Sequence, residues 1–271
     1  MEFTAEILEF LDSEMERPEL YGWFHIMWLV ITVSATVLLC KFFPQGTDRQ
    51  VRTVIVSITL AVIVLEIYKQ INYTFSVAED GTIRSDYQWY AFPFQFCSMP
   101  MYVGLLASLP GKGKFHKCMC AFLATYAVFA GLCVMAYPAD VFISTIGINI
   151  QTMICHGSMI VIGVYLLYTG YVPCDHKTIL YAVPVFASGV VLASVMNEIA
   201  YMTGLLETEV FNMFFVSPHC DPSLPVYSLV QAVVPFPWSL ILYILGFSAA
   251  AYIILLLAKA AQHIFAKKVT A

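Results

Sequence analysis

Residues 51–75, VRTVIVSITLAVIVLEIYKQINYTF, decide the fold class of this chain. The run contains about the 20 mostly apolar residues that an α-helix needs to cross the hydrocarbon core of a bilayer. It also carries two charged side chains, Glu66 and Lys69, well inside the apolar part. A charged group at the centre of a bilayer costs at least ~2.5–3.5 kcal/mol, so charges within a span are functional candidates by default. The stretch therefore predicts a membrane-spanning helix that contributes to a polar site.

The composition of the whole chain agrees with a membrane location. Of its 271 residues, 60% are hydrophobic and 11% are charged, and the mean hydropathy is +0.79. Soluble globular domains carry about 25% charged residues. The chain has too little polar surface for a soluble protein, and we expect an all-α, polytopic membrane protein. Its cysteines are scattered without a CxxC pair, which indicates neither a disulfide framework nor a metal site.

Seven stretches are long and apolar enough to form spanning helices. Breaks rich in Pro, Gly and charge separate them, which predicts short loops and one seven-helix membrane domain over residues 22–258. Residues 1–21 are acidic and have apolar positions at helical spacing, which predicts an amphipathic helix on the outer surface. Residues 259–271 are predicted to be a basic cytoplasmic tail. The seven predicted spans are 22–43, 51–75, 90–109, 117–137, 142–168, 178–203 and 227–258.

The distribution of charge predicts the orientation of the bundle. Ten of the 13 Lys and Arg residues flank the first, third and fifth loops or follow the last span. The N-terminal segment and the other loops hold Arg17 and Arg84 as their basic residues, together with most of the acidic residues. Because cytoplasmic loops carry an excess of Lys and Arg, we predict that the N-terminus lies outside and the C-terminus inside.

With this orientation, polar residues from five predicted helices fall at one depth, in the outer half or near the middle of the membrane. We therefore predict a polar cavity there, open to the exterior or sideways to lipid. Polar pairs also hold membrane helices together without any other role, but such pairs have no reason to gather at one depth. The predicted lining residues are His25, Glu66, Lys69, Gln95, Ser98, Asn197, Glu198 and Asn212.

One cysteine stands in an unusual setting. Residues 92–102, FPFQFCSMPMY, place Cys97 near the start of the third predicted span, between Pro93 and Pro100. Buried cysteine is commonly an apolar filler. Proline breaks the hydrogen-bond ladder of a helix and frees backbone N–H groups, so the segment also suits a reactive thiol.

A nucleophilic thiol needs a base or cation close by and donors for the oxyanion of the attacked carbonyl. His156, in the fifth predicted span, is the candidate base, and Lys69 would favour the thiolate. Gln95, Ser98 or Asn197 would supply the donors. By residue count His156 lies deeper than Cys97, so the two meet only if a helix tilts or the third helix is broken.

The order of several blocks resembles the YwaF-like family of bacterial integral membrane proteins, which is related to the eukaryotic transmembrane protein 164 family. The blocks are WFHIMWL, LEIYKQ, FPFQFCSMPMY, VFAGLCVMAYP, ICHGSMIVIGVYLL, VMNEIAY and VPFPWSL. The eukaryotic relative is known as an acyltransferase that moves fatty acyl chains between phospholipids through a cysteine. The resemblance implies that Cys97 takes the acyl chain and that His156 activates the thiol.

The leading hypothesis is a thiol-dependent acyltransferase that acts on membrane phospholipids, which are both substrate and solvent. A lipid or ester hydrolase with the same two residues is a close alternative. A transporter or small-molecule-binding protein, with Glu66, Lys69 and Glu198 as a polar relay, is a third. We expect no cofactor, no nucleic acid and no protein partner, and a multi-pass location in the plasma membrane, or in an intracellular membrane of a eukaryotic cell.

Overall fold

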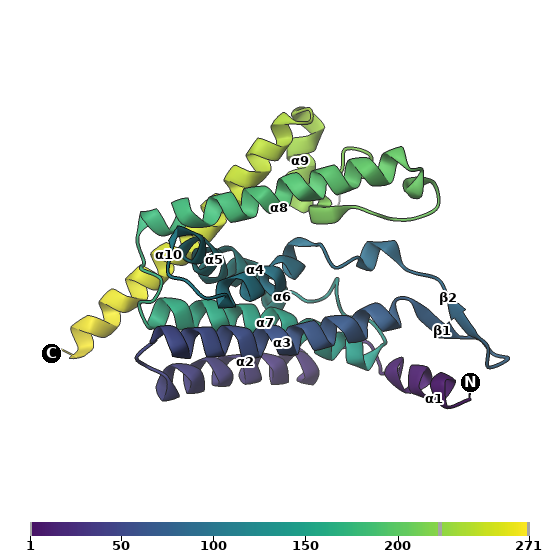
Figure 1. Cartoon of the computed structure of the whole chain (residues 1–271), viewed down its shortest axis with the longest axis horizontal. Helices are drawn as coiled ribbons and strands as arrows, with labels where there is room; N and C mark the ends of the chain where they lie inside the picture. The colour runs from purple at the N-terminus through teal and green to yellow at the C-terminus, as the bar shows by residue number, and fades with distance from the viewer. Residues whose placement is uncertain (1, 222–223, 270–271) are drawn as a thin grey trace.

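The structure is a computed structural model that describes residues 2–221 and 224–269, and these form an elongated bundle of helices (Figure 1). A small antiparallel hairpin, β1 and β2, extends from the end at which the N-terminus lies. The helices and strands are α1 (Glu2–Leu11), α2 (Trp23–Phe42), α3 (Asp48–Asn72), β1 (Phe75–Val77), β2 (Ile83–Ser85), η1 (Trp89–Ala91), η2 (Phe96–Ser98), α4 (Met99–Ser108), α5 (Lys114–Ala124), α6 (Tyr126–Ala136), α7 (Ile146–Tyr168), α8 (His176–Met202), η3 (Leu205–Glu207), η4 (Met213–Phe215), α9 (Pro225–Val233) and α10 (Trp238–Val269).

Six helical segments of the described chain are long and apolar enough to cross a membrane. They are Trp23–Phe42, Asp48–Asn72, Lys114–Ala136, Ile146–Tyr168, His176–Met202 and Trp238–Ile264. The chain is thus an all-α, multi-pass integral membrane protein, as the composition predicts. These segments agree with six of the seven predicted spans to within a few residues, except that Lys114–Ala136 is broken at Thr125, between α5 and α6, and that the last span is interrupted. Pro235 and Pro237 separate α9 from α10, and α10 continues through the predicted tail as far as Val269.

The third predicted span, residues 90–109, is not one continuous helix. Two short 3₁₀ turns, η1 and η2, precede α4, and the apolar helical part covers only Phe96–Ser108. Pro93 lies in the extended stretch before η2, and Pro100 occupies the first turn of α4. Proline is tolerated in a first turn, where the N–H has no helical partner, but not in a helix interior. The two prolines therefore determine where the helix begins.

Residues 91–109 nevertheless run alongside α3, in the opposite direction. Gln70, near the end of α3, donates a 2.9 Å hydrogen bond to the carbonyl of Ala91. Arg52, near the start of α3, donates to backbone carbonyls at the end of α4, including that of Leu109. The segment thus covers the eighteen residues of α3 from Gln70 back to Arg52, about 27 Å at 1.5 Å per residue.

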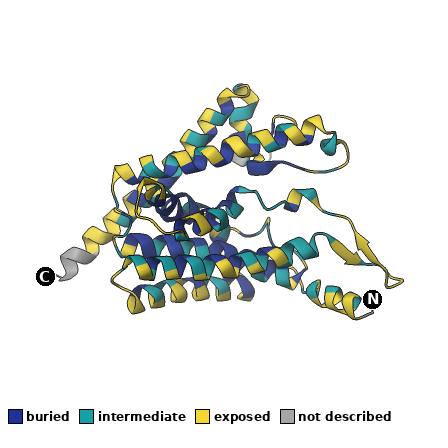
Figure 2. Ribbon diagram, viewed as in Figure 1, coloured by how far each residue is buried: buried dark blue, intermediate teal, exposed yellow. Residues whose placement is uncertain are grey.

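The centre of the bundle is formed by α5, α6 and α7, which are largely buried, whereas α2 and α10 expose apolar faces at its edges (Figure 2). Close packing here depends on glycine. A Cβ at Gly131 of α6 would lie 2.7 Å from the carbonyl oxygen of His156 on α7, and one at Gly163 of α7 would lie 2.6 Å from that of Leu123 on α5. Small residues let membrane helices approach in this way. The α6–α7 contact therefore fixes the backbone at His156.

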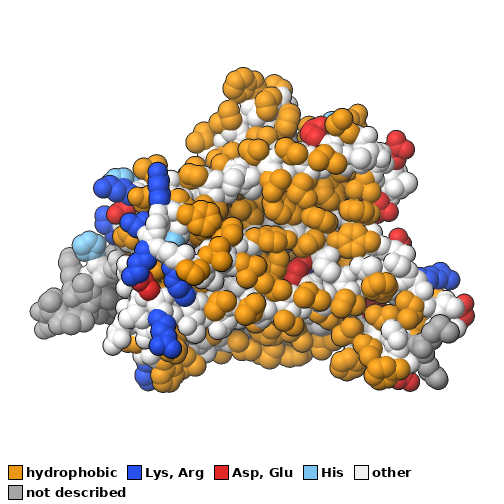
Figure 3. All heavy atoms as spheres, in the orientation of Figure 1, with side chains coloured by type: hydrophobic (Ala, Val, Ile, Leu, Met, Phe, Trp, Pro, Cys, Tyr) orange, Lys and Arg blue, Asp and Glu red, His pale blue; other side chains and the backbone are white. Residues whose placement is uncertain are grey.

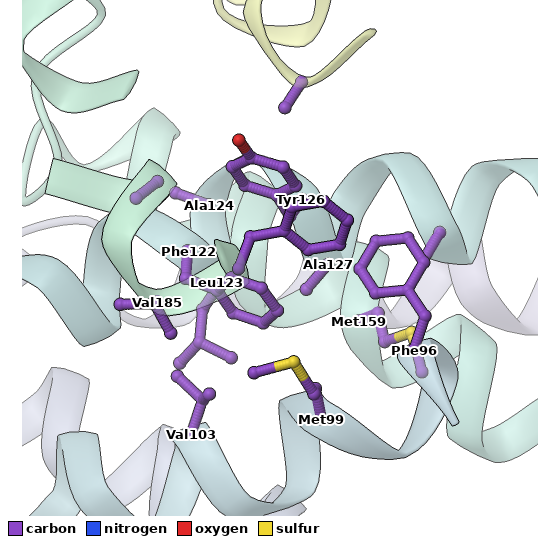
Figure 4. Packing of buried hydrophobic residues seen from close by; sticks show 14 of the residues in the cluster. Phe96, Met99, Val103, Phe122, Leu123, Ala124, Tyr126, Ala127, Met159 and Val185 are labelled. Carbon is purple, nitrogen blue, oxygen red and sulfur yellow. The ribbon is translucent and has the colours of Figure 1, made fainter. Parts of the chain in front are cut away.

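Aromatic rings bind the start of α4 to this centre. The Phe96 ring lies 5.1 Å from that of Phe186 on α8, and Phe186 stacks on Tyr126 of α6 at 4.6 Å. Figure 4 shows Phe96 and Met99 of the α4 segment among side chains of α5, α6 and α7. Buried residues on both sides of Cys97 thus anchor the short segment that carries the thiol.

The surface separates into a belt and two ends. Figure 3 shows a broad hydrophobic surface along the bundle, with Lys and Arg gathered near the end where α10 projects. Acidic side chains gather mainly at the opposite end, near α1 and the hairpin. A hydrophobic belt between charged ends is the surface expected of a protein that crosses a bilayer.

Candidate functional site

A buried polar network surrounds Glu66 of α3. The Lys69 ammonium lies 2.8 Å from Glu66 Oε1, and both side chains are mostly buried. Gln70 donates to the same oxygen at 2.8 Å, and Gln151 of α7 donates to Oε2 at 3.3 Å. Tyr87, in the loop before α4, donates to Gln70 Oε1 at 2.7 Å. Every polar atom named here has a partner, which is the condition for placing an ion pair between membrane helices.

The thiol and the polar network lie in neighbouring parts of the bundle. Glu66 and Met101 line the same groove, and Met101 also lines a small void together with Cys97 and Cys155. Cys155 directly precedes His156 in α7, the helix from which Gln151 reaches Glu66.

His156 is buried in α7 and has a defined orientation. Its Nδ1 lies 2.7 Å from the carbonyl oxygen of Thr152, one turn earlier in the helix. A carbonyl oxygen only accepts hydrogen bonds, so Nδ1 carries the proton in this arrangement and Nε2 of the neutral ring carries a lone pair. Nε2 is buried and has no hydrogen-bond partner in the described part of the chain. An imidazole held in this way has the tautomer that a general base needs.

Cys97 lies in η2, at the point where the broken segment becomes helical. Its half-buried side chain borders a small void of about 10 Å³ that is also lined by Cys155, Pro100 and Met101. A water molecule needs about 10–15 Å³, so the void has room for one at most. Within residues 2–221 and 224–269, no hydrogen bond joins the thiol to His156. The Cys97 and His156 side chains lie in the same part of the bundle as Lys69, but they are not in direct hydrogen-bond contact with each other.

Two other predicted cavity residues hold in place a loop that contains a third, Asn212. The Asn197 side chain accepts from the N–H of Met213 at 2.7 Å and donates to its carbonyl at 3.0 Å. Gln95 accepts from the N–H of Phe214 at 2.8 Å and donates to the carbonyl of Asn212 at 3.0 Å. These amides are used by backbone groups, so they are not free to bind an oxyanion. Of the three predicted donors, Ser98 remains, because its hydroxyl does not cap α4.

The loop that they hold is strained. Phe214 and Phe215 have φ angles of 56° and 57°, in the left-handed region that bulky residues rarely adopt. Phe214 is fully buried, and its carbonyl accepts a 3.0 Å hydrogen bond from Tyr243 of α10. Strained backbone persists where its surroundings over-determine it. The paired amides of Gln95 and Asn197 supply that constraint directly beside the Cys97 segment.

Two predicted cavity residues have other partners. His25 is buried at the start of α2, where Nε2 binds the carbonyl of Met135 at 2.8 Å and Nδ1 accepts from the N–H of Tyr21. Glu198 lies toward the surface and binds His219 at 3.1 Å. His25 thus joins α2 to α6, and Glu198 joins α8 to the loop before α9. Neither has a hydrogen bond or ion pair with the Glu66 network in the described residues.

Some members of the site were not singled out from the sequence. Gln70 is four residues after Glu66 and therefore on the same helix face, which is a signal that spacing carries. Tyr87, Cys155 and Met101 carry no such signal, because their positions depend on how the loop and the broken helix fold back. No group of three or more His, Cys, Asp or Glu side chains in the described chain could hold a metal ion.

These features define a multi-pass, all-helical integral membrane protein with a buried polar network beside a broken helix. The chain belongs to the TMEM164 family, which matches residues 20–258. Comparisons with curated proteins and with solved structures gave no match.

Proposed function

We propose that this protein is a phospholipid acyltransferase that uses Cys97 as its nucleophile and His156 as its base. Membership of the TMEM164 family supports the chemical class, since that family is associated with acyltransferase activity. The observation that carries the residue assignment is His156: a buried imidazole with its Nδ1 proton directed at Thr152 and an unpaired Nε2. His25, by contrast, binds through both ring nitrogens.

The proposed reaction has two balanced steps. The Cys97 thiol loses its proton to Nε2 of His156 and attacks the ester carbonyl of a phospholipid, forming a C–S bond. The ester C–O bond breaks, and the lysophospholipid leaves with the proton from His156. The hydroxyl of a second lysophospholipid then gives its proton to His156 and attacks the thioester carbonyl. A new ester C–O bond forms, the C–S bond breaks, and His156 returns the proton to the Cys97 sulfur, which restores the thiol. Ser98 is the proposed donor to the oxyanion.

In this proposal, the positive charge of Lys69 stabilises the Cys97 thiolate, which is enclosed and therefore poorly hydrated. A thiolate beside a void with room for one water molecule has little hydration, which disfavours its formation. A cation in electrostatic range offsets this cost. Glu66 and its amide partners hold the ammonium in place. His156 and Cys97 would approach hydrogen-bond distance when substrate binds, because catalytic hydrogen bonds commonly tighten only in the complex.

Transfer and hydrolysis differ in the acceptor that reaches the thioester. Hydrolysis needs one water molecule, which is the most that the void beside Cys97 accommodates. Transfer to a lysophospholipid needs the acceptor to arrive through lipid instead. Product analysis separates the two reactions, because hydrolysis yields free fatty acid and transfer yields a new diacyl phospholipid.

The test is acyl exchange between phospholipids in proteoliposomes. We expect Cys97→Ala to abolish exchange and His156→Gln to slow it by roughly 10²–10⁴-fold, the usual contribution of a general base. Cys133→Ala, at an exposed cysteine of α6, is the matched control and should retain full exchange. Undiminished exchange in Cys97→Ala would overturn the proposal. Transport that persists in Cys97→Ala, with no exchange in the wild type, would favour the polar-relay alternative.

We also propose that the bundle crosses the plasma membrane seven times, with residues 91–109 as the seventh crossing. The antiparallel course of this segment along α3 supports the count. The basic residues near the α10 end and the acidic residues near α1 support an outside N-terminus and a cytoplasmic C-terminus. We further propose that, within this family, the chain is part of the bacterial YwaF-like branch that its sequence blocks resemble.

A further inference from the structure

A lateral groove lies between the second half of α3 and α4. It has a volume of about 470 Å³, within the range of small-molecule sites. Ile63, Ile67 and Ile71 line one side, and Tyr102 and Leu105 line the other. The helical part from Ile63 to Ile71 is about 12 Å long at 1.5 Å per residue. The groove is therefore elongated along the direction in which lipid chains lie.

Part of the polar network around Glu66 lines one wall of the groove. Glu66 and Gln70 both line it; Glu66 pairs with Lys69, and Gln70 donates a hydrogen bond to the same carboxylate oxygen. An otherwise apolar groove thus meets polar side chains along one wall. A phospholipid has the same arrangement of polarity, because its apolar acyl chain is joined to a polar ester and headgroup.

One residue separates the groove from the thiol. Met101 lines the lateral groove and also lines the small void that contains Cys97 and Cys155. Methionine is unbranched and has three rotatable bonds, which makes it the most adaptable side chain in an apolar core. A change in its side-chain conformation would therefore connect the two spaces without moving a helix.

We propose that the groove binds one acyl chain of a membrane phospholipid and that Met101 is the movable wall between that chain and Cys97. The occupant follows from position, since α3 spans the bilayer and the groove opens from its flank into the space that lipid fills. The inference rests on the proposed function for its reaction, but it makes a claim about access that can be measured without catalysis.

The test measures how fast a long-chain N-alkyl maleimide, which partitions into the bilayer, alkylates Cys97 in proteoliposomes. Mass spectrometry follows the Cys97 peptide relative to the Cys133 peptide, an exposed reference on α6. We expect Leu105→Trp, which fills the groove, to slow Cys97 alkylation several-fold. Met101→Ala, which removes the wall, should accelerate it several-fold. Met101→Leu should stay close to the wild type.

Matched controls lie outside the groove. Leu60→Trp places the same ring on an exposed part of α3, and Met27→Ala makes the same truncation on α2. Both should leave Cys97 alkylation unchanged. Equal effects of Leu105→Trp and Leu60→Trp, or an unchanged rate in Met101→Ala, would overturn the groove. A misfolded variant is recognised because alkylation of Cys40, a buried cysteine of α2 that lines neither space, rises with that of Cys97.

Acyl exchange measured on the same samples separates this inference from the proposed function. Groove-dependent alkylation without any Cys97-dependent exchange would support the groove and refute the acyltransferase. Cys97-dependent exchange that survives Leu105→Trp, with unchanged alkylation, would refute the groove and leave the acyltransferase in place.

Discussion

At the scale of single residues, the Glu66–Lys69 pair shows how two charges are accommodated between membrane helices. Each charge has its counter-charge three residues away on the same helix, and Gln70 and Gln151 saturate the carboxylate. Breaking a buried ion pair by removing one partner costs about 3–5 kcal/mol, whereas replacing both partners by well-packed neutral residues is often nearly neutral. The pair is therefore a costly way to stabilise a bundle, and a charge acting on Cys97 and His156 accounts better for its retention.

We predict that Lys69→Met will destabilise the protein by about 3–5 kcal/mol, because the Glu66 carboxylate is left buried without a cation. The double variant Glu66→Gln/Lys69→Met should recover most of that loss, since a glutamine oxygen still accepts from Gln70 and Gln151 can turn its own amide oxygen toward the new N–H₂ group. Thermal and denaturant unfolding in detergent measure the difference. If the proposed role of Lys69 is correct, the double variant will fold normally and still lose most acyl exchange. Recovery of both stability and exchange would assign Lys69 a purely structural role.

The residue types of the site could be read from the sequence, but their partners could not. A charged or polar group inside an apolar run is visible at Glu66, Lys69 and His156, since burial is implied by the run itself. Gln95 and Asn197 were visible for the same reason, yet they bind the backbone of residues 212–214 instead of facing a cavity. That outcome depends on the path of a loop far away in sequence, which no local pattern encodes.

At the scale of elements, proline placement explains two of the three places where a predicted span is interrupted; the third, at Thr125 between α5 and α6, has no proline beside it. The apolar periodicity of 90–109 and 227–258 predicts two unbroken spans, whereas the chain interrupts both beside prolines. Pro93 and Pro100 leave η2 as a short 3₁₀ turn, and this turn carries Cys97. The interruption also leaves backbone groups without helical partners, and irregular backbone inside a membrane protein must find hydrogen-bond partners within the protein. The Gln95 side chain supplies one such partner by binding the N–H of Phe214 in the strained loop.

We predict that Asn197→Ala will loosen this loop. The change leaves the N–H and carbonyl of Met213 without their side-chain partner in a buried site, which costs about 1–3 kcal/mol for each unsatisfied group. Hydrogen exchange should rise across residues 211–217, and acyl exchange should fall because the loop supports the Cys97 segment. Ser194→Ala is the matched control, since its hydroxyl binds only the carbonyl of Val190 within α8. Unchanged protection of residues 211–217 from hydrogen exchange in Asn197→Ala would show that Asn197 does not hold this loop.

At the scale of the whole molecule, the number of crossings depends on the segment of 91–109. Six helices satisfy length and composition, and six crossings alone would leave both termini on one side. The helical part of the broken segment, Phe96–Ser108, is too short to span about 30 Å as an α-helix. The stretch before it, residues 91–95, adds to this length. Contacts with both Gln70 and Arg52 support the proposal that the segment is a seventh crossing.

We predict that the loops before and after this segment lie on opposite sides of the membrane. Glu79 is exposed near the hairpin tip, and Lys112 is exposed after α4. In intact cells, a membrane-impermeant maleimide should label Glu79→Cys, whereas Lys112→Cys should react only after permeabilisation. Glu6→Cys should behave like Glu79→Cys, and His263→Cys like Lys112→Cys, because the basic side faces the cytoplasm. Labelling of positions 79 and 112 from the same side would make the segment re-entrant and reduce the count to six. The wall of the lateral groove would then begin and end on one face of the bilayer, and the lipid path to Cys97 would be confined to that leaflet.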